Sequence, residues 1–216
     1  QELQMHWGRA DATSESNGRA VFNESNGYLS VFHLDDPARD ETDNLKAKDL
    51  GTTAATGVIG QGRHFTTDSG ILGGENITTF PTGPAPHSTE LWLRAEKPGD
   101  RIVCWGSGGP KTMVQMIMGK PPRMIMDCYG AGAGLAANSP VPLNEWIHVI
   151  HTCRRGESRM YVNGSPVAVS TVEDSPLDIK NPVKMFIGGW ENFVFNGDMD
   201  EVRISKVARS SDWVRL

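Results

Sequence analysis

The chain has 216 residues, of which 38% are hydrophobic and 22% charged, so it can bury a core of its own without disulfides. Its 24 glycines and 13 prolines suit many short strands joined by turns. The formal net charge of -5 argues against a nucleic-acid partner, and no apolar run approaches the length needed for membrane insertion.

The start of the chain predicts a strand and a short helix ahead of the main domain. Leu3–Trp7 alternates apolar and polar residues, as a strand does. Ser14 is a candidate cap for a helix that runs to Phe22. We take residues 1–27 as a leading segment and residues 28–216 as one domain.

From residue 28 onward, alternation of apolar and polar residues dominates the sequence. Clusters of Gly, Pro, Asn and Asp separate almost all of the alternating runs, as turn chemistry requires. The predicted strands are Tyr28–Leu34, Arg63–Thr66, Glu90–Ala95, Arg101–Trp105, Met113–Met118, Met124–Tyr129, Trp146–Cys153, Ser158–Val162, Pro166–Val172, Lys184–Gly188 and Met199–Ser205. So many evenly spaced strands predict an all-β, two-sheet antiparallel sandwich of the jelly-roll type with one or two short helices.

Several connections between these strands have a predictable form. Asn163-Gly164 favours a type I′ turn, which matches the twist of a hairpin. Lys120-Pro121-Pro122 lies between two apolar runs and predicts another hairpin. The charged stretch at residues 35–49 is interpreted as a surface loop. Near the end, Ser210 or Ser211 is a candidate cap for one helical turn at Asp212–Leu216.

The three cysteines, Cys104, Cys128 and Cys153, are too few for a disulfide framework in a chain of this length. All three lie in apolar, strand-like runs, so buried free thiols are expected, with one bridge between neighbouring strands as the alternative. The methionine cluster is interpreted as core filling. Its members are Met113, Met116, Met118, Met124 and Met126.

Two parts of the chain resemble known sequences. Met5–Gly8 followed by Ser16–Phe22 resembles the end of an uncharacterised bacterial β domain, which commonly precedes a concanavalin A-like, laminin-G-type jelly roll in large surface proteins. The rest of the chain resembles that jelly roll through an ordered series of short motifs. They are Val31–Asp35, Gly57–Phe65, Glu90–Leu93, Glu145–Val149, Met160–Gly164, Ile187–Gly189 and Asn196–Ser205. The resemblance implies one convex and one concave sheet, in a module of a secreted or cell-surface protein.

The resemblance also implies a structural calcium ion. In related jelly rolls a calcium often joins an early loop to the aspartate of a late strand. By position, Asp200 matches that aspartate, and Asp35 or Asp36 lies in the matching loop. Calcium prefers such hard oxygen ligands, and an ion here would tie together parts of the chain that sheet pairing alone leaves frayed. The alternative is that Asp200 pairs with Arg203 or caps a turn.

The carboxylates of this sequence do not form the pattern expected of a glycan-cleaving enzyme. A retaining hydrolase needs two carboxyl groups about 5 Å apart, usually on alternate residues of one strand. No Glu-x-Asp-x-x-Glu pattern is present, and Asp127 stands alone within a strand. The histidines lack the spacing of metal ligands, and His148 is assigned to the core. A non-catalytic domain is therefore expected.

Aromatic residues carry the hypothesis of a glycan site, because sugar rings stack their C–H faces on flat side chains while polar groups hold the hydroxyls. Trp92 and Trp146 belong to structural motifs and are assigned to the core. The aromatic and rim candidates are Trp105, Tyr129, Trp190, Glu191, Asn192 and Phe193. The polar candidates are Gln115, Asp127, His151 and Arg154.

Three functions are compatible with these observations. The first is a non-catalytic carbohydrate-binding module of a larger extracellular protein, which holds the glycan on the concave face or its rim loops. Its expected partners are a polysaccharide and the other domains of its parent chain. The second is an adhesion or spacer module with protein partners or none, and the third is a polysaccharide hydrolase or lyase. Fold alone does not separate them. An exposed aromatic shelf favours the first, a plugged face the second, and paired carboxylates the third.

Overall fold

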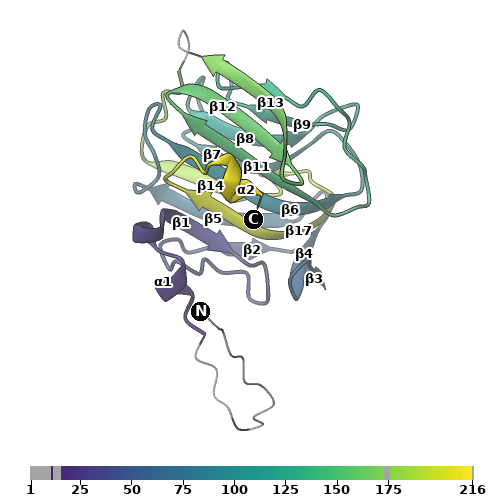
Figure 1. Ribbon diagram of the computed structural model, residues 1–216. Helices are drawn as coiled ribbons and strands as arrows, with labels where there is room; N and C mark the ends of the chain where they lie inside the picture. Colours follow the sequence, from purple (N-terminus) through teal and green to yellow (C-terminus); the bar gives the residue numbers. More distant parts are fainter. Residues whose placement is uncertain (1–10, 12–15, 173–175, 216) are drawn as a thin grey trace, which may run out of the picture.

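The computed structural model describes residue 11 and residues 16–172 and 176–215. These residues form two antiparallel sheets packed face to face, with a short helix near each end of the described chain (Figure 1). The predicted all-β sandwich is therefore confirmed. The strand expected at Leu3–Trp7 and the cap expected at Ser14 lie outside the described residues. The division into residues 1–27 and 28–216 stays a prediction.

The front sheet faces the viewer in Figure 1 and has the strand order β13-β12-β11-β6-β17-β4-β3, with β1 also paired to β17. Its strands are β1 (Tyr28–Phe32), β3 (Thr53–Thr56), β4 (Gln61–Phe65), β6 (His87–Ala95), β11 (Ile147–Arg154), β12 (Gly156–Val162), β13 (Ser165–Val172) and β17 (Gly197–Ser205).

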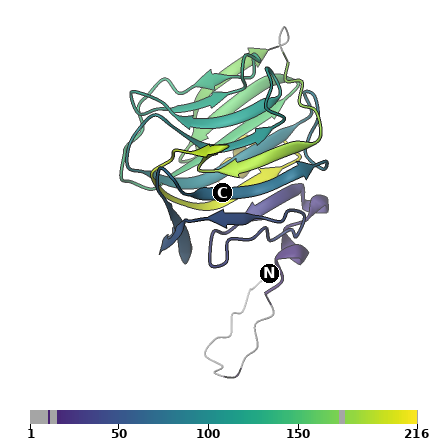
Figure 2. The same cartoon turned by 180° about the vertical axis from the view of Figure 1, so that it is seen from behind.

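The back sheet faces the viewer in Figure 2 and has the order β10-β9-β8-β7-β14-β5-β2. Its strands are β2 (Lys48–Leu50), β5 (Gly70–Ile77), β7 (Asp100–Gly106), β8 (Met113–Met118), β9 (Met124–Asp127), β10 (Leu135–Ala136) and β14 (Val183–Ile187). The remaining elements are α1 (Gly18–Val21), the 3-10 helix η1 (Glu24–Asn26), the hairpin of β15 (Gly189–Trp190) and β16 (Asn192–Phe193), and α2 (Ser211–Val214).

Strands β6 and β11 lie side by side in the middle of the front sheet and alternate between its two faces. Leu91 and Leu93 of β6 and Val149 of β11 are fully buried in the core between the sheets. Successive side chains of a strand point to opposite faces, so Trp92 and His148 point outward. Core packing thereby decides which side chains form the outer surface of this sheet.

A β-bulge in β17 sends two neighbouring acidic residues in different directions. The register of β17 against β6 shifts after Asp200, and Glu201 has a φ of 54°. The Asp200 carboxylate accepts hydrogen bonds from the amides of Val58 at 2.8 Å and Ile59 at 3.0 Å, in the β3–β4 turn. Glu201 Oε1 instead lies 2.6 Å from His33 Nδ1, just after β1. The bulge thus ties two edge segments to the middle of the sheet.

The charged stretch at residues 35–49 is not the simple surface loop that the sequence predicts. Its last residues begin β2, and Asp40 is only 6% exposed. Burial raises the pKa of the Asp40 carboxyl, although hydrogen bonds to it oppose the shift. Four backbone amides donate to this carboxylate at 2.8 to 3.2 Å, those of Val31, Thr42, Asn44 and Leu45. The loop is therefore built around the buried carboxylate of Asp40. The high number of charged residues in the segment gave no sign that one of them is buried.

Strands β2, β3, β5 and β10 and the hairpin of β15 and β16 were not predicted from the sequence, and β5 is the longest of them. Strand β5 contains three glycines, and Gly70 serves a packing role. A Cβ at Gly70 would lie 1.9 Å from the ring of Phe193, so only glycine leaves room for that ring. The glycine signal here marks close approach of a side chain rather than a turn.

The turn and cap predictions agree with the structure. Asn163 and Gly164 have φ values of 48° and 75°, as a type I′ turn requires. Strands β8 and β9 form the predicted hairpin across residues 119–123. The Ser210 side chain accepts from the amide of Trp213 and caps α2.

The cysteines and methionines also lie where they were expected. Cys104, Cys128 and Cys153 are buried and free, and burial raises the pKa of each thiol. The five methionines of the cluster are at most 3% exposed. Within the part of the chain that the structure describes, no helix is long and apolar enough to cross a membrane.

Two histidines are buried side by side in the core, with ring centroids 5.7 Å apart. His87 Nδ1 lies 3.1 Å from the carbonyl oxygen of Ala85, and His151 Nε2 lies 2.8 Å from Ser158 Oγ. Burial lowers the pKa of His87 to about 4, and burial together with His87 lowers the pKa of His151. Both rings are therefore neutral at pH 7, and each must gain a proton when the protein unfolds in acid.

We predict that the domain loses stability as the pH falls below the unfolded-state pKa of histidine. A depressed folded-state pKa contributes stability that is full above about pH 6.5 and is lost toward pH 4. For His87 alone, the unfolding free energy should drop by about 2 kcal/mol between pH 7.5 and pH 5. Urea unfolding at both pH values measures this loss.

His87→Leu, which cannot titrate, should reduce that acid sensitivity. An acid sensitivity that is the same in His87→Leu as in the parent would contradict the prediction.

Candidate functional site

A cavity of about 690 Å³ lies on the outer face of the front sheet, and we call it the aromatic groove. Strands β6, β11 and β17 form its floor, and α2 and two turns form its walls. The lining residues are Ile59, Glu90, Trp92, Trp146, His148, Asn163, Gly164, Arg203, Trp213, Val214 and Arg215. Three tryptophans and several charged side chains therefore meet in one place.

The floor of the groove is a stacked pair of rings. Trp92 of β6 and His148 of β11 face each other across paired strands, with ring centroids 5.0 Å apart and planes tilted by 34°. The turn at Asn163 adds to this floor, because its side-chain oxygen accepts from the amide of His148 at 2.8 Å. Trp146 stands beside the floor with the guanidinium of Arg94 over its ring, 5.4 Å from the centroid.

A chain of alternating charges runs along the outer face of the sheet into the groove. His33 contacts Glu201 at 2.6 Å, and Arg203 bridges Glu201 at 2.5 Å and Glu90 at 3.4 Å. Glu90 Oε1 then lies 3.0 Å from His148 Nε2. Burial opposes ionisation of Glu201, but hydrogen bonds from His33 and Arg203 outweigh it and hold its pKa below the usual value. Glu201 is thus a fixed carboxylate at neutral pH.

The wall formed by α2 is held by an arginine between two aromatic rings. The guanidinium carbon of Arg209 lies 4.6 Å from the ring centroid of Tyr28 and 4.7 Å from that of Trp213. Val214 packs on Ile150 and Tyr161 of the sheet. The first strand of the sheet and the last helix together position Trp213 at the groove.

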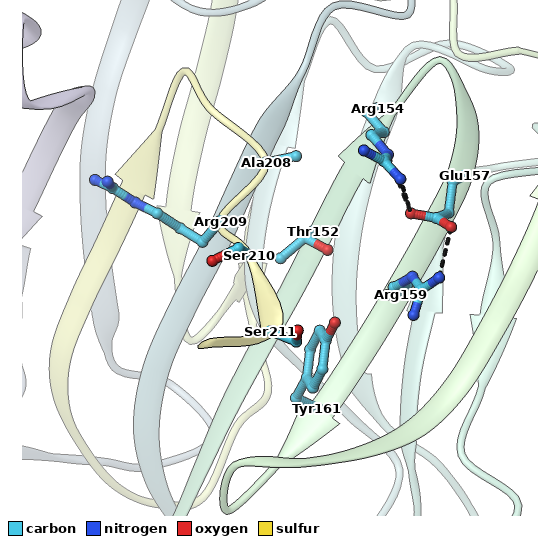
Figure 3. Close-up of a pocket in the computed structure, with 9 residues that line it drawn as sticks. All are labelled: Thr152, Arg154, Glu157, Arg159, Tyr161, Ala208, Arg209, Ser210 and Ser211. Atoms are coloured by element: carbon cyan, nitrogen blue, oxygen red, sulfur yellow. Dashed lines mark hydrogen bonds and ion pairs between the residues drawn. The ribbon is translucent and has the colours of Figure 1, made fainter. Parts of the chain in front are cut away.

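A second, more polar cavity of about 300 Å³ lies on the same face, and we call it the arginine pocket (Figure 3). The lining residues are Thr152, Arg154, Glu157, Arg159, Tyr161, Ala208, Arg209, Ser210 and Ser211. Glu157 lies between two guanidinium groups, 2.9 Å from Arg154 Nη2 and 2.7 Å from Arg159 Nη2. Figure 3 shows the guanidinium of Arg209 turned away from this trio.

Two of the predicted ligand-binding residues lie in the core, so their assignment to the surface is wrong. Trp105 is 0% exposed, packs edge-on against Phe80, and donates its indole N–H to Thr89 Oγ1 at 3.0 Å. His151 is also 0% exposed and lies beside His87. Both occupy inward positions of their strands.

The other predicted residues are divided between the two sheets. Gln115 and Asp127 are hydrogen-bonded to each other at 3.3 Å on the outer face of the back sheet, and Gln115 is only 4% exposed. Tyr129 follows β9 and is 48% exposed. Arg154 lies in the arginine pocket. The predicted set therefore does not form a single site.

The rim residues Trp190, Glu191, Asn192 and Phe193 form the β15–β16 hairpin over the back sheet. Trp190 and Phe193 pack on the outward ring of Phe186, with centroids 5.1 Å and 6.2 Å away. Trp190 and Glu191 line a cavity of about 330 Å³ together with Ser107 and Gly108. This hairpin is on the opposite sheet from the aromatic groove, so the two are separate candidates.

The sequence analysis missed the residues that build the aromatic groove. Trp92, Trp146 and His148 were assigned to the core, but all three are partly exposed and line the groove. The signal was present in β6, where Leu91 and Leu93 must face inward and Trp92 between them must face outward. Trp213 carried no such signal, because its packing against Arg209 and against the cluster of Ile150, Tyr161 and Val214 places it there.

The predicted calcium site at Asp35 and Asp200 is not tested by the structure and stays a prediction. Asp200 has a role of its own, because one oxygen accepts from the amides of Val58 and Ile59. This agrees with the alternative that Asp200 caps a turn. Its other oxygen is buried and has no hydrogen-bond partner among the described residues, so an ion would have to use that oxygen. Asp35 is exposed, and Asp36 pairs with Arg63 at 2.7 Å.

Residues 65–215 match the family model described as the Concanavalin A-like lectin/glucanases superfamily. None of the curated proteins compared with the chain matches it in sequence.

Several solved structures share the fold at low identity. Domain 4 of the extracellular arabinanase AbnA from Geobacillus stearothermophilus, in complex with arabinotriose, is 18% identical with a TM-score of 0.69 over 87% of this chain and 96% of that one. The binding domain of Paraclostridial Mosquitocidal Protein 1 is 12% identical with a TM-score of 0.69, over 88% of this chain and 51% of that one. A Bacteroides ovatus protein named as a candidate carbohydrate-binding protein is 20% identical, with a TM-score of 0.53 over 78% of this chain and 47% of that one.

We predict that Arg209→Met loosens Trp213. Removing the cation between the two rings should lower the unfolding free energy by about 1 kcal/mol. It should also increase quenching of tryptophan fluorescence by acrylamide. In a Trp213→Phe background the same substitution should leave quenching unchanged, and an equal increase there would show that Arg209 does not hold Trp213.

The calcium prediction is tested with Asp200→Ala. Loss of the acceptor for two amides should lower the unfolding free energy by about 1 to 2 kcal/mol with chelator present. If Asp200 holds calcium, adding the ion should raise the Tm of the parent and not that of the variant. Identical responses of the two proteins to calcium would refute the site.

Proposed function

Because the chain belongs to the concanavalin A-like lectin/glucanase superfamily, we propose that it is a non-catalytic carbohydrate-binding module and that the aromatic groove holds the glycan. The observation that carries the proposal is the meeting of Trp92, Trp146 and Trp213 in one cavity. Flat indole faces stack on the C–H faces of sugars, and these three lie on a surface rather than in the core.

The polar residues of the groove suit sugar hydroxyls. Glu90 accepts hydrogen bonds, Arg203 and Arg215 donate them, and His148 does either. Glu90 and Arg203 are already fixed by each other, so little side-chain freedom is lost when a ligand binds. A groove with rigid rings and rigid polar groups is what a sugar-binding site requires.

The electrostatics favour binding over cleavage. A glycosidase needs a carboxylic acid whose pKa is raised so that it can protonate the leaving group. Glu201 has a lowered pKa, and Arg203 bridges it to Glu90. The guanidinium of Arg203 stabilises the charged form of Glu201, which makes Glu201 unsuited to proton donation.

The structural neighbours support the proposal by analogy. Domain 4 of the arabinanase AbnA was solved with arabinotriose and belongs to an extracellular enzyme. We infer that this chain likewise acts outside the cell as one module of a larger protein, where it keeps its parent on a polysaccharide. An adhesion module is the second candidate, because the fold alone does not separate it from a carbohydrate-binding module.

We predict that Trp92→Ala and Trp146→Ala each weaken polysaccharide binding about tenfold, because each removes a stacking surface of about 1.4 kcal/mol. A glycan array identifies the bound polysaccharide, and titration calorimetry measures the affinity of each variant. Trp190→Ala is the matched control, since Trp190 lies on the hairpin over the back sheet.

Loss of binding from Trp190→Ala alone would place the glycan at the hairpin instead of the groove. An array that shows no binding to neutral or acidic polysaccharides would favour the adhesion function. Release of reducing ends from a bound polysaccharide would show that the domain is an enzyme.

A further inference from the structure

The arginine pocket lies on the same face as the aromatic groove, at the far side of α2. Along β11, His148 lines the groove, Ile150 lies under Val214 of α2, and Thr152 lines the arginine pocket. Four residues of a strand span about 13 Å. The two cavities are therefore close enough for neighbouring parts of one oligosaccharide to reach both.

Donors outnumber acceptors in the arginine pocket. Arg154 donates Nε and Nη2 to Glu157 Oε1 at 3.1 Å and 2.9 Å, and Arg159 donates Nη2 to Oε2 at 2.7 Å. These contacts use three of the N–H groups of the two guanidiniums, out of about five on each. The remaining donors have no second carboxylate among the residues that line the pocket.

Glu157 keeps the two arginines in place rather than cancelling them. Its side chain is 22% exposed, whereas those of Arg154 and Arg159 are 61% and 42% exposed. The hydrogen bond from Arg159 lowers the pKa of Glu157, so the trio carries two positive charges and one negative charge at neutral pH. In Figure 3 the hydroxyls of Thr152 and Tyr161 point toward the trio from the other side of the pocket.

The net charge of the chain opposes nonspecific binding of acidic polymers. With a formal net charge of -5, the protein as a whole repels a polyanion, so an anionic group binds only where positive charge is concentrated. A local excess of one positive charge, with fixed planar donors, is suited to the two or three oxygens of a carboxylate or sulfate group.

We propose that the arginine pocket binds a carboxylate or sulfate group of an acidic polysaccharide whose neighbouring sugars occupy the aromatic groove. The proposal rests on the proposed function of the groove and names the class of its ligand. Arg154 and Arg159 contact the anionic group, and Glu157 is a positioning residue for both.

The test compares the binding of polygalacturonate, a sulfated galactan, and carboxyl-reduced or desulfated forms of the same polymers, measured by calorimetry at low and high salt. The parent should bind at least one acidic polymer more tightly than its neutral form, and that preference should shrink with salt. Arg154→Gln and Arg159→Gln should each weaken binding of the acidic polymer about five- to tenfold and leave the neutral form unchanged. The polymer that responds shows whether the group is a carboxylate or a sulfate.

Arg123→Gln removes the same charge at the β8–β9 turn and should change neither affinity. If the neutral polymers bind as tightly as the acidic ones, or if the pocket variants keep the acidic preference, this inference is wrong while the groove proposal stands. If Trp92→Ala leaves all binding intact, the groove proposal itself fails.

Discussion

The alternation of side chains along β6 and β11 is the constraint on which the rest of this molecule depends. Successive residues of a strand point to opposite faces, so each residue that enters the core places its neighbour on the outer surface. Leu91 and Leu93 are buried in the core, and Trp92 between them is thereby held at the floor of the aromatic groove. A site built on paired central strands is held more firmly than one built on loops.

The charges on the outer face follow from the same arrangement. Glu90 and Glu201 are nearly buried, and a buried carboxylate destabilises the fold unless a charged or hydrogen-bonding group pairs with it. Arg203 pairs with both, and the bulge in β17 turns Glu201 toward His33 and Asp200 toward the β3–β4 turn. One irregularity in β17 therefore connects the β3–β4 turn and the end of β1, which both lie on the side of β17 opposite β6, to the middle of the sheet. His33 and Arg203 hold Glu201 in its ionised form, which opposes proton transfer from it.

The C-terminal segment divides the outer face into two sites of different chemistry. Trp213 and Arg215 border the aromatic groove, whereas Ser210 and Ser211 border the arginine pocket. The segment is held by the contacts of Val214 with the sheet and by Arg209 between Tyr28 and Trp213. Residues from both ends of the described chain thus shape one surface, with rings at one side of α2 and guanidinium groups at the other.

Local pattern in the sequence was enough to predict the sandwich, most of the long strands, the Asn163-Gly164 turn, the Ser210 cap and the buried thiols, because each depends on a few neighbouring residues. Local pattern did not identify the residues of the site. Trp92 and Trp146 were assigned to the core because they lie in structural motifs, yet both line the groove. Trp105 was assigned to the surface but is buried, because an apolar run does not show which of its residues face the second sheet. Pairing of strands far apart in the sequence decided that His148 lies opposite Trp92 and that Arg203 lies beside Glu90. Only tertiary packing brought Trp213 to the groove, since its position depends on contacts with Arg209 and with strands that the local sequence does not contain.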